Sequence, residues 1–187
     1  MTTTIDLGGG AEPVTLDEAK SWCRIERDDE DGLIGDLVRA ARQGIEAMTG
    51  LVLARRVFRL ALDDLPAHGW IETTRRPLAG IVAITAYGPA GEPVSFDADE
   101  AIVERALGLE AIRLSPAVRA AAVNGVEVEF EAGYGEGAVP ENIRVALRMI
   151  VAASYELRAA VDPQLQPAAI PKQALALLAP YRRVTLG

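Results

Sequence analysis

The chain has 187 residues, 50% of them hydrophobic and 25% charged, a balance typical of a folded globular protein. Its formal net charge of −8 makes nucleic acid a poor default ligand, because an acidic surface gains nothing from releasing the counterions of phosphates. The single cysteine, Cys23, excludes an internal disulfide. It lies between Trp22 and Ile25 in an apolar helical stretch, so we expect a buried, unreactive thiol.

The N-terminal segment combines a flexible arm with a capped helix. Residues 1–13 are predicted to form a loose arm, because three glycines follow one another at positions 8–10. They lack the basic and apolar regions of a signal peptide. Thr15 and Glu18 have the spacing of a capping box, which predicts a short helix that ends near Ile25.

Four acidic residues at positions 28–31 resemble a metal-binding loop at first sight, but they lack the alternating spacing and closing glutamate of a calcium loop. Negative charge is favourable at a helix N-terminus, so we expect them to open a second helix from about Glu30 to Thr49, with Gly50 as its stop. An apolar stripe supports this helix: Leu33, Leu37, Ala40, Ala41, Ile45 and Met48.

The hydrophobic period changes to two between Leu51 and about Glu131, which predicts strands. Turn chemistry at Gly88–Gly91 and at Asn124-Gly125 separates the apolar runs. No predicted helix in this region is long enough for a parallel crossover, so we expect an antiparallel meander or small barrel.

The strand after the second turn alternates apolar residues with Glu127, Glu129 and Glu131, which places three carboxylates on one face. They resemble half of a metal or hydrolase site, but no histidine accompanies them. Arg55 and Arg59 are candidates to lie opposite on a neighbouring strand. We therefore expect a solvated or cross-paired face, which in a ring would also be a candidate for an acidic channel lining.

A long helix is predicted over residues 141–160, and from Val145 to Tyr155 it is apolar on nearly every side except at Arg148 and Ser154. A helix of this kind in a small chain is expected to pack against its own helices and against a neighbouring subunit. The candidates for that subunit interface, expected to face acidic groups or a neighbour, are Arg144, Arg148 and Tyr155.

The C-terminal part contains a proline-rich stretch at 161–171, a short helix predicted over 172–178, and an extended tail. Two interpretations of the tail stay open: a frayed end, or a peptide that docks on a partner by adding a strand or filling a groove. Its docking candidates are Tyr181, Arg182, Arg183, Val184 and Leu186.

Together these elements predict an α+β fold, a small helical bundle with an inserted antiparallel β meander or small barrel. Residues 1–50 supply the arm and two helices of the helical body, and residues 51–137 form the inserted β-region. Residues 138–187 supply the long helix, the short helix and the C-terminal docking tail, so that one compact domain carries an insertion.

The sequence contains no recognisable catalytic or cofactor-binding motif. The only histidine, His68, is predicted in a loop, and no serine or cysteine lies in a recognisable nucleophile motif. The glycine-rich segment 133–137 lacks the lysine of a phosphate-binding loop. We therefore expect no catalytic residues, no cofactor and no metal, and a small hydrolase that uses the glutamates of the strand 126–131 remains the alternative from another class.

Several segments in order resemble the head–tail connector proteins of long-tailed phages and gene transfer agents. The first of them, Pro13-Val14-Thr15-Leu16-Asp17-Glu18-Ala19-Lys20, resembles the opening of those proteins. Further likeness lies in Ala40-Ala41-Arg42, Arg76-Pro77-Leu78, Ala132-Gly133-Tyr134-Gly135, Val139-Pro140, Arg144 through Tyr155-Glu156, and Leu178-Ala179-Pro180-Tyr181-Arg182.

The resemblance implies a structural adaptor that forms a ring of about twelve subunits beneath the portal, extends the DNA channel and links the head to the neck or tail. The implied partners are further copies of the chain, the portal protein, and the next neck, stopper or tail protein. DNA would pass through without sequence-specific binding, and no membrane is involved. The implied location is the head–tail junction of a virion or phage-like particle, with the host cytoplasm before assembly. Another neck or tail-completion protein is the alternative function.

Overall fold

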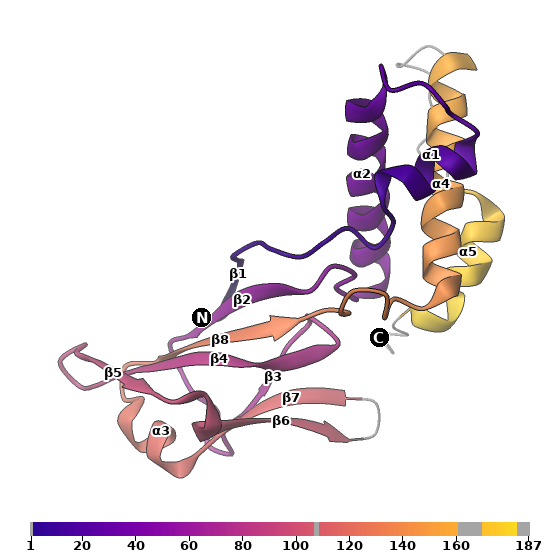
Figure 1. Cartoon of the computed structure of the whole chain (residues 1–187). Coiled ribbons are helices and arrows are strands. Elements are labelled where there is room, and N and C mark those ends of the chain that lie inside the picture. Colours follow the sequence, from indigo (N-terminus) through magenta and orange to yellow (C-terminus); the bar gives the residue numbers. More distant parts are fainter. Residues whose placement is uncertain (1, 107–108, 161–169, 183–187) are drawn as a thin grey trace. The chain divides into compact units, whose positions relative to one another are not determined.

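The computed structural model describes residues 2–106, 109–160 and 170–182, which form two compact units. The β unit consists of Met1–Gly10 and Ala54–Tyr134, and the helical unit consists of Ala11–Leu53 and Gly135–Gly187. Each unit therefore takes its residues from two separate stretches of the sequence (Figure 1).

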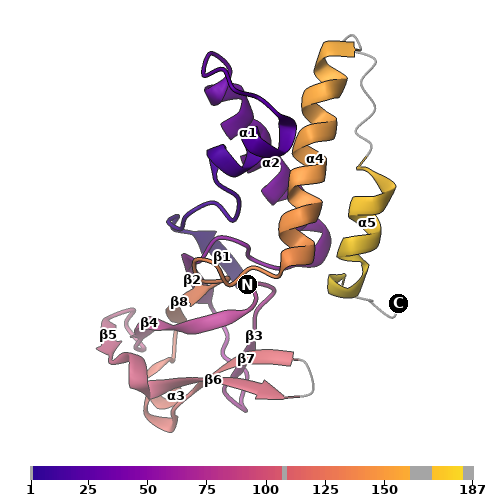
Figure 2. The ribbon, with the colours of Figure 1, turned by 45° about the vertical axis from the view of Figure 1, so that its right-hand side comes forward.

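The helical unit contains α1 (Leu16–Cys23), α2 (Asp31–Thr49), α4 (Glu141–Ala160), α5 (Lys172–Leu178) and a 3-10 turn (Ala179–Tyr181). Within it, α4 lies between α2 and α5, and α1 packs against both α2 and α4 (Figure 2). The predicted capping box at the start of α1 is confirmed, since the side chains of Thr15 and Glu18 each accept a hydrogen bond from the other's backbone N–H.

The core of the helical unit is aliphatic. It is built mainly from α2 and α4, whose inward residues recur at the spacing of one helix face. The buried residues of these helices include Ile34, Val38, Ala41, Ile45, Ile143, Ala146, Leu147 and Val151, and α5 adds Ala174 and Leu178. The remaining apolar residues of α4 between Val145 and Tyr155 are only half-buried in the isolated chain.

The β unit contains two antiparallel sheets, with strand orders β1-β2-β8-β4-β5 and β3-β7-β6. The bounds are β1 (Thr2–Asp6), β2 (Arg56–Leu62), β3 (Trp70–Glu72), β4 (Leu78–Tyr87), β5 (Pro93–Phe96), β6 (Ala101–Ala106), β7 (Leu109–Leu114) and β8 (Val126–Ala132). A short helix, α3 (Pro116–Ala121), and a 3-10 turn (Ala98–Glu100) lie between strands.

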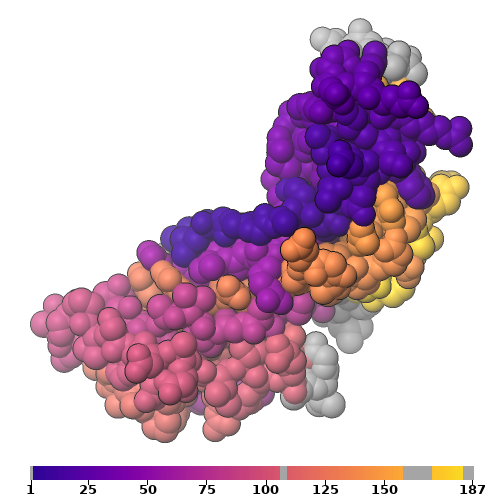
Figure 3. Space-filling view, in the orientation of Figure 1, coloured from indigo at the N-terminus to yellow at the C-terminus, as the bar shows by residue number. Residues whose placement is uncertain are grey.

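The α+β class and the antiparallel β-region are confirmed, but the strands do not follow the neighbour order of a simple meander. The last strand, β8, lies between β2 and β4. The first residues differ more clearly from expectation, since Thr2–Asp6 belong to no loose arm and instead pair with β2. Threonine and isoleucine favour strands, and Figure 3 shows this N-terminal segment, in indigo, at the surface of the β unit.

The centre of the larger sheet is a pair of stacked aromatic rings. Phe58 of β2 lies opposite Phe130 of β8, their centroids are 5.8 Å apart, and both side chains are fully buried. The alternation of buried and half-buried residues along β8 is the one that the sequence predicts, with the glutamates on the outer face.

Candidate subunit and docking surfaces

An exposed tryptophan marks one surface of the helical unit. Trp22 of α1 is 45% exposed, although the sequence pattern places it in an apolar stretch. The guanidinium carbon of Arg148, from α4, lies 5.1 Å from the centroid of the Trp22 ring, within the range of a cation–π interaction. A shallow hollow beside the ring is lined by Asp17, Glu18, Ser21, Trp22 and Arg148, and we call this surface the Trp22 face.

Two predicted interface arginines are held by carboxylates of their own chain. Arg144 forms an ion pair with Glu18 of α1, and its Nη1 atom lies 3.2 Å from Oε2 of Glu141. Its Nε atom also donates to the carbonyl oxygen of Pro13, at 3.3 Å. Arg148 forms an ion pair with Glu141. Arg144 therefore joins α4 to α1, and Arg148 lies between Glu141 and the Trp22 ring.

The third predicted interface residue, Tyr155, is also engaged inside the helical unit. Its hydroxyl donates to a carboxylate oxygen of Glu30 and accepts a hydrogen bond from Nη2 of Arg27, at 3.3 Å. Its ring is half-buried. Tyr155 therefore ties the end of α4 to the connection between α1 and α2.

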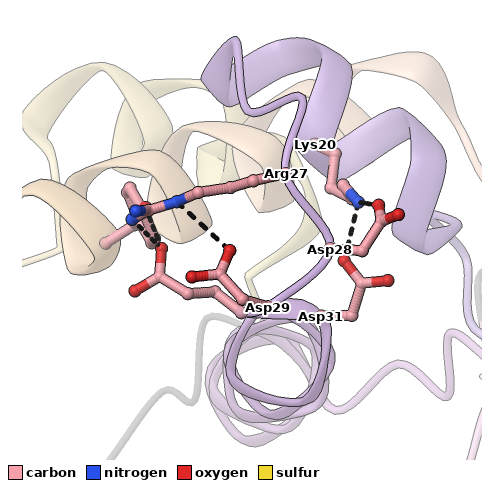
Figure 4. A network of polar contacts seen from close by, with 7 residues as sticks. Lys20, Arg27, Asp28, Asp29 and Asp31 are labelled. Atoms are coloured by element: carbon pink, nitrogen blue, oxygen red, sulfur yellow. Dashed lines mark hydrogen bonds and ion pairs between the residues drawn. The ribbon is translucent and has the colours of Figure 1, made fainter.

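Two cations compensate half of the charge of the acidic run before α2 (Figure 4). The Nζ atom of Lys20, which is nearly buried, lies 2.5 Å from Asp28 and 2.7 Å from Asp31, and Nε of Arg27 lies 3.5 Å from Asp29. The helix begins at Asp31, as predicted. Among the described residues, no group of three histidine, cysteine, aspartate or glutamate side chains is placed to hold a metal ion.

The capping box has a measurable electrostatic consequence. The hydrogen bond from the backbone of Thr15, and to a lesser degree the nearby Arg144, lower the pKa of Glu18 despite its partial burial. A carboxyl whose pKa is lower in the folded chain contributes stability above its unfolded pKa, and this contribution is lost as the pH falls through the folded value.

We expect Arg144→Met to raise the pKa of Glu18 toward that of an ordinary glutamate, because one of the cations that favour its carboxylate is removed. A pH titration of the Glu18 carboxyl by NMR measures the change. Arg39→Met, which removes a cation paired with Asp36 on α2, is the matched control and leaves Glu18 unchanged. Equal Glu18 titration curves in the wild type and in Arg144→Met would contradict this prediction.

The carboxylates of β8 lie on the outer face of the larger sheet. Glu129 lies opposite Arg59 of β2, whose Nη2 and Nε atoms are 2.7 and 3.0 Å from Glu129 Oε1. Glu127 is 3.9 Å from the same guanidinium. Glu131 lies opposite Val57, and the other predicted partner, Arg55, instead donates to the carbonyl oxygen of Gly133 at 3.4 Å.

Arginines gather at one end of the larger sheet, where the sequence alone indicates no basic cluster. The guanidinium carbons of Arg56 and Arg75 lie 5.6 and 5.4 Å from the centroid of the Phe58 ring. Arg55 and Arg75 are exposed, and Arg56 pairs with Asp6 at 3.0 Å. We call this surface, formed by Arg55, Arg56 and Arg75, the arginine end of the β unit.

The sequence does contain a signal that could have indicated the arginine end. Two Arg-Arg pairs, at 55–56 and 75–76, each precede or open a strand. Both strands begin beside the same residue of β8, since Arg56 and Leu78 each pair with Ala132. The pairs are distant in sequence and become neighbours only through this register.

The C-terminal candidates are described in part. Tyr181 is half-buried in the 3-10 turn and Arg182 is exposed, whereas Arg183, Val184 and Leu186 lie outside the described residues.

His68 accepts a hydrogen bond at Nδ1 from the backbone N–H of Trp70, at 3.1 Å. Burial raises the pKa of the Cys23 thiol, although that side chain is half-buried and not fully enclosed.

Comparison with known families identifies the class of protein. The model of the family described as "Phage gp6-like head-tail connector protein" matches residues 13–108. The chain belongs to this family. The resemblance predicted from the sequence is therefore confirmed.

Solved structures extend the comparison to the whole connector fold. A chain from the "Neck of empty GTA particle computed with C6 symmetry" is 24% identical, with a TM-score of 0.77 over 99% of this chain and 98% of that one. A chain from the "Virion of native gene transfer agent (GTA) particle" is also 24% identical, with a TM-score of 0.76 over 98% of each chain.

A third solved structure, the "Neck of native GTA particle computed with C12 symmetry", contains a chain 24% identical to the connector, with a TM-score of 0.75 over 99% of this chain and 98% of that one. No curated protein matches the chain. Within the described parts of the connector, no helix has both the length and the hydropathy needed to cross a bilayer.

Proposed function

We propose that the connector is a non-enzymatic adaptor that assembles as a ring of about twelve copies beneath the portal of a phage or gene transfer agent particle. The observation that carries this proposal is the family assignment, together with a fold shared along nearly the whole chain with neck proteins of particles analysed with C6 and C12 symmetry. The ring extends the DNA channel and presents a platform to the next neck or tail protein.

Lateral contacts between subunits are the first requirement of this ring. The half-buried apolar residues of α4 and the Trp22 face supply surface for them, and Arg144, Arg148 and Tyr155 act there by fixing α4 against α1 and α2. Tryptophan and arginine are the residues most enriched where protein interfaces derive their binding energy.

The acidic outer face of β8 is the proposed lining of the channel. The carboxylates of Glu127, Glu129 and Glu131 follow one another along one side of the strand. Arg59 compensates only part of this charge. A surface that stays acidic repels phosphates, so DNA passes it without binding in sequence-specific or nonspecific fashion.

The C-terminal tail is the proposed attachment to the portal. Tyr181, Arg182, Arg183, Val184 and Leu186 combine an aromatic ring, two cations and two aliphatic residues after the proline at position 180. Copies wait as monomers in the host cytoplasm until a portal ring presents repeated docking sites. Binding then raises the local concentration of subunits, and lateral contacts close the ring.

We expect truncation after Pro180 to abolish the ring on the portal, because docking is lost while the described core stays intact. Electron microscopy of purified portal mixed with the full-length or truncated chain measures this, with circular dichroism as the check on folding. A full-length variant with Arg182→Gln and Arg183→Gln separates the role of charge from that of the apolar residues.

A ring that persists on the portal after truncation would move the docking site to the helical unit and leave the adaptor function standing. Absence of any association between the full-length chain and the portal would overturn the portal adaptor. It would favour another neck or tail-completion protein, whose partner is then sought among tail proteins.

A further inference from the structure

The connector carries two exposed surfaces, on different units, whose unpaired charged groups, among the described residues, are of opposite sign. The Trp22 face of the helical unit presents Asp17 and Glu18 beside an exposed ring, and the arginine end of the β unit presents Arg55 and Arg75. A ring built from identical copies by a head-to-tail contact needs two such different and complementary surfaces on every copy.

The Trp22 face has an acidic group that the chain itself leaves unmatched. Asp17 lies in the first turn of α1, is exposed, and forms no ion pair within the described part of the chain. Glu18, in contrast, is already paired with Arg144. Arg148 already lies over the Trp22 ring, which is still 45% exposed. A partner for this face therefore needs a cation that reaches Asp17 and a flat group that covers the part of the Trp22 ring left exposed.

The arginine end has the matching features. The guanidinium of Arg75 is exposed, lies over the ring of the fully buried Phe58, and has no carboxylate partner among the described residues. Its position over the ring restricts the side chain before any partner arrives, which lowers the entropy lost on binding. Guanidinium groups also pair with carboxylates through two hydrogen bonds and stack on aromatic rings.

We propose that the Trp22 face of one copy binds the arginine end of the next copy, with Asp17 paired to Arg75 and the Arg55 guanidinium against the Trp22 ring. This inference rests on the proposed ring and names its lateral contact. The unpaired charges of the two surfaces set the direction of assembly, because contacts between like surfaces would place Asp17 against Asp17 or Arg75 against Arg75.

The test reverses one charge on each surface. Asp17→Arg and Arg75→Asp each place like charges at every contact of the ring, so each variant alone is expected to yield at least about tenfold fewer portal-bound rings than the wild type. In an equimolar mixture of the two variants, an alternating ring has opposite charges at every contact. The mixture is therefore expected to restore rings, which no contact inside a single chain explains.

Electron microscopy on the portal measures ring yield, and Asp97→Arg, at an exposed acidic residue of the β unit outside both surfaces, is the matched control expected to assemble normally. Single variants that both assemble like the wild type, or a mixture of folded variants that gives no rings, would overturn the inference while wild-type rings keep the adaptor. A wild type that forms no ring would overturn the adaptor itself.

Discussion

Replacement of Phe130 with alanine is expected to lower the free energy of unfolding of the β unit by about 4 kcal/mol. The ring is fully buried and stacks on Phe58, so the change removes apolar burial, leaves a cavity between β2 and β8, and deletes an aromatic pair. Each unit contains one tryptophan, Trp22 in the helical unit and Trp70 in the β unit. Urea unfolding followed by Trp70 fluorescence, in a Trp22→Phe background, reports on the β unit alone.

Phe96→Ala is the matched control for this prediction. Phe96 lies on the edge strand β5 and is only half-buried, so its truncation is expected to cost about 1 kcal/mol. Equal losses of unfolding free energy in the two variants would show that the stacked pair at the centre of the sheet stabilises the β unit no more than a phenylalanine at its edge.

Gly125→Ala is expected to destabilise the β unit by about 3 kcal/mol, through backbone geometry alone. Gly125 has a φ of 106°, and a Cβ atom there would lie 2.5 Å from the carbonyl oxygen of Leu62. The backbone cannot simply move away, since Gly125 accepts a hydrogen bond from Tyr87 at 3.0 Å and Asn124 donates one to Tyr87 at 2.8 Å.

Gly91→Ala separates the cost of a positive φ from the cost of a steric clash. Gly91 also has a positive φ, of 80°, but a Cβ atom there would meet nothing within 4 Å. Its substitution is expected to cost about 1 kcal/mol, the penalty of the left-handed conformation without a clash. Thermal unfolding of both variants measures the difference, and a smaller loss for Gly125→Ala than for Gly91→Ala contradicts the assigned clash.

The local elements were predictable because their causes are local. The capping residues of α1, the bounds of α4 and α5, and the alternation of β8 all depend on neighbours within a few positions. The short helix α3 was missed although Ser115 caps it and Pro116 occupies its first turn, because six residues are too few for a helical stripe.

Pairing between distant segments was not predictable in the same way. Periodicity shows that a segment is a strand but not which strand lies beside it, so it gave neither the position of β8 between β2 and β4 nor the pairing of β1. Charge complementarity alone indicated that Arg59 lies opposite the glutamates of β8. The surfaces depend on the same information. The arginine end needs the register of three strands, and the exposure of Trp22 needs the packing of α1 against α4.

The two units of the chain are interleaved along the sequence, and this has a consequence for its synthesis. Thr2 pairs with Leu62, and Arg56 pairs with Ala132. The larger sheet therefore contains the first strand of the chain, β1, but is complete only after the last strand, β8, has been synthesised. The helical unit likewise cannot form its core until α4 has been synthesised, because α2 packs against α4. Contacts of such long separation are slow to form. Neither unit closes before its second stretch has left the ribosome, since the β unit needs β8, which ends at Ala132, and the helical unit needs α4, which ends at Ala160.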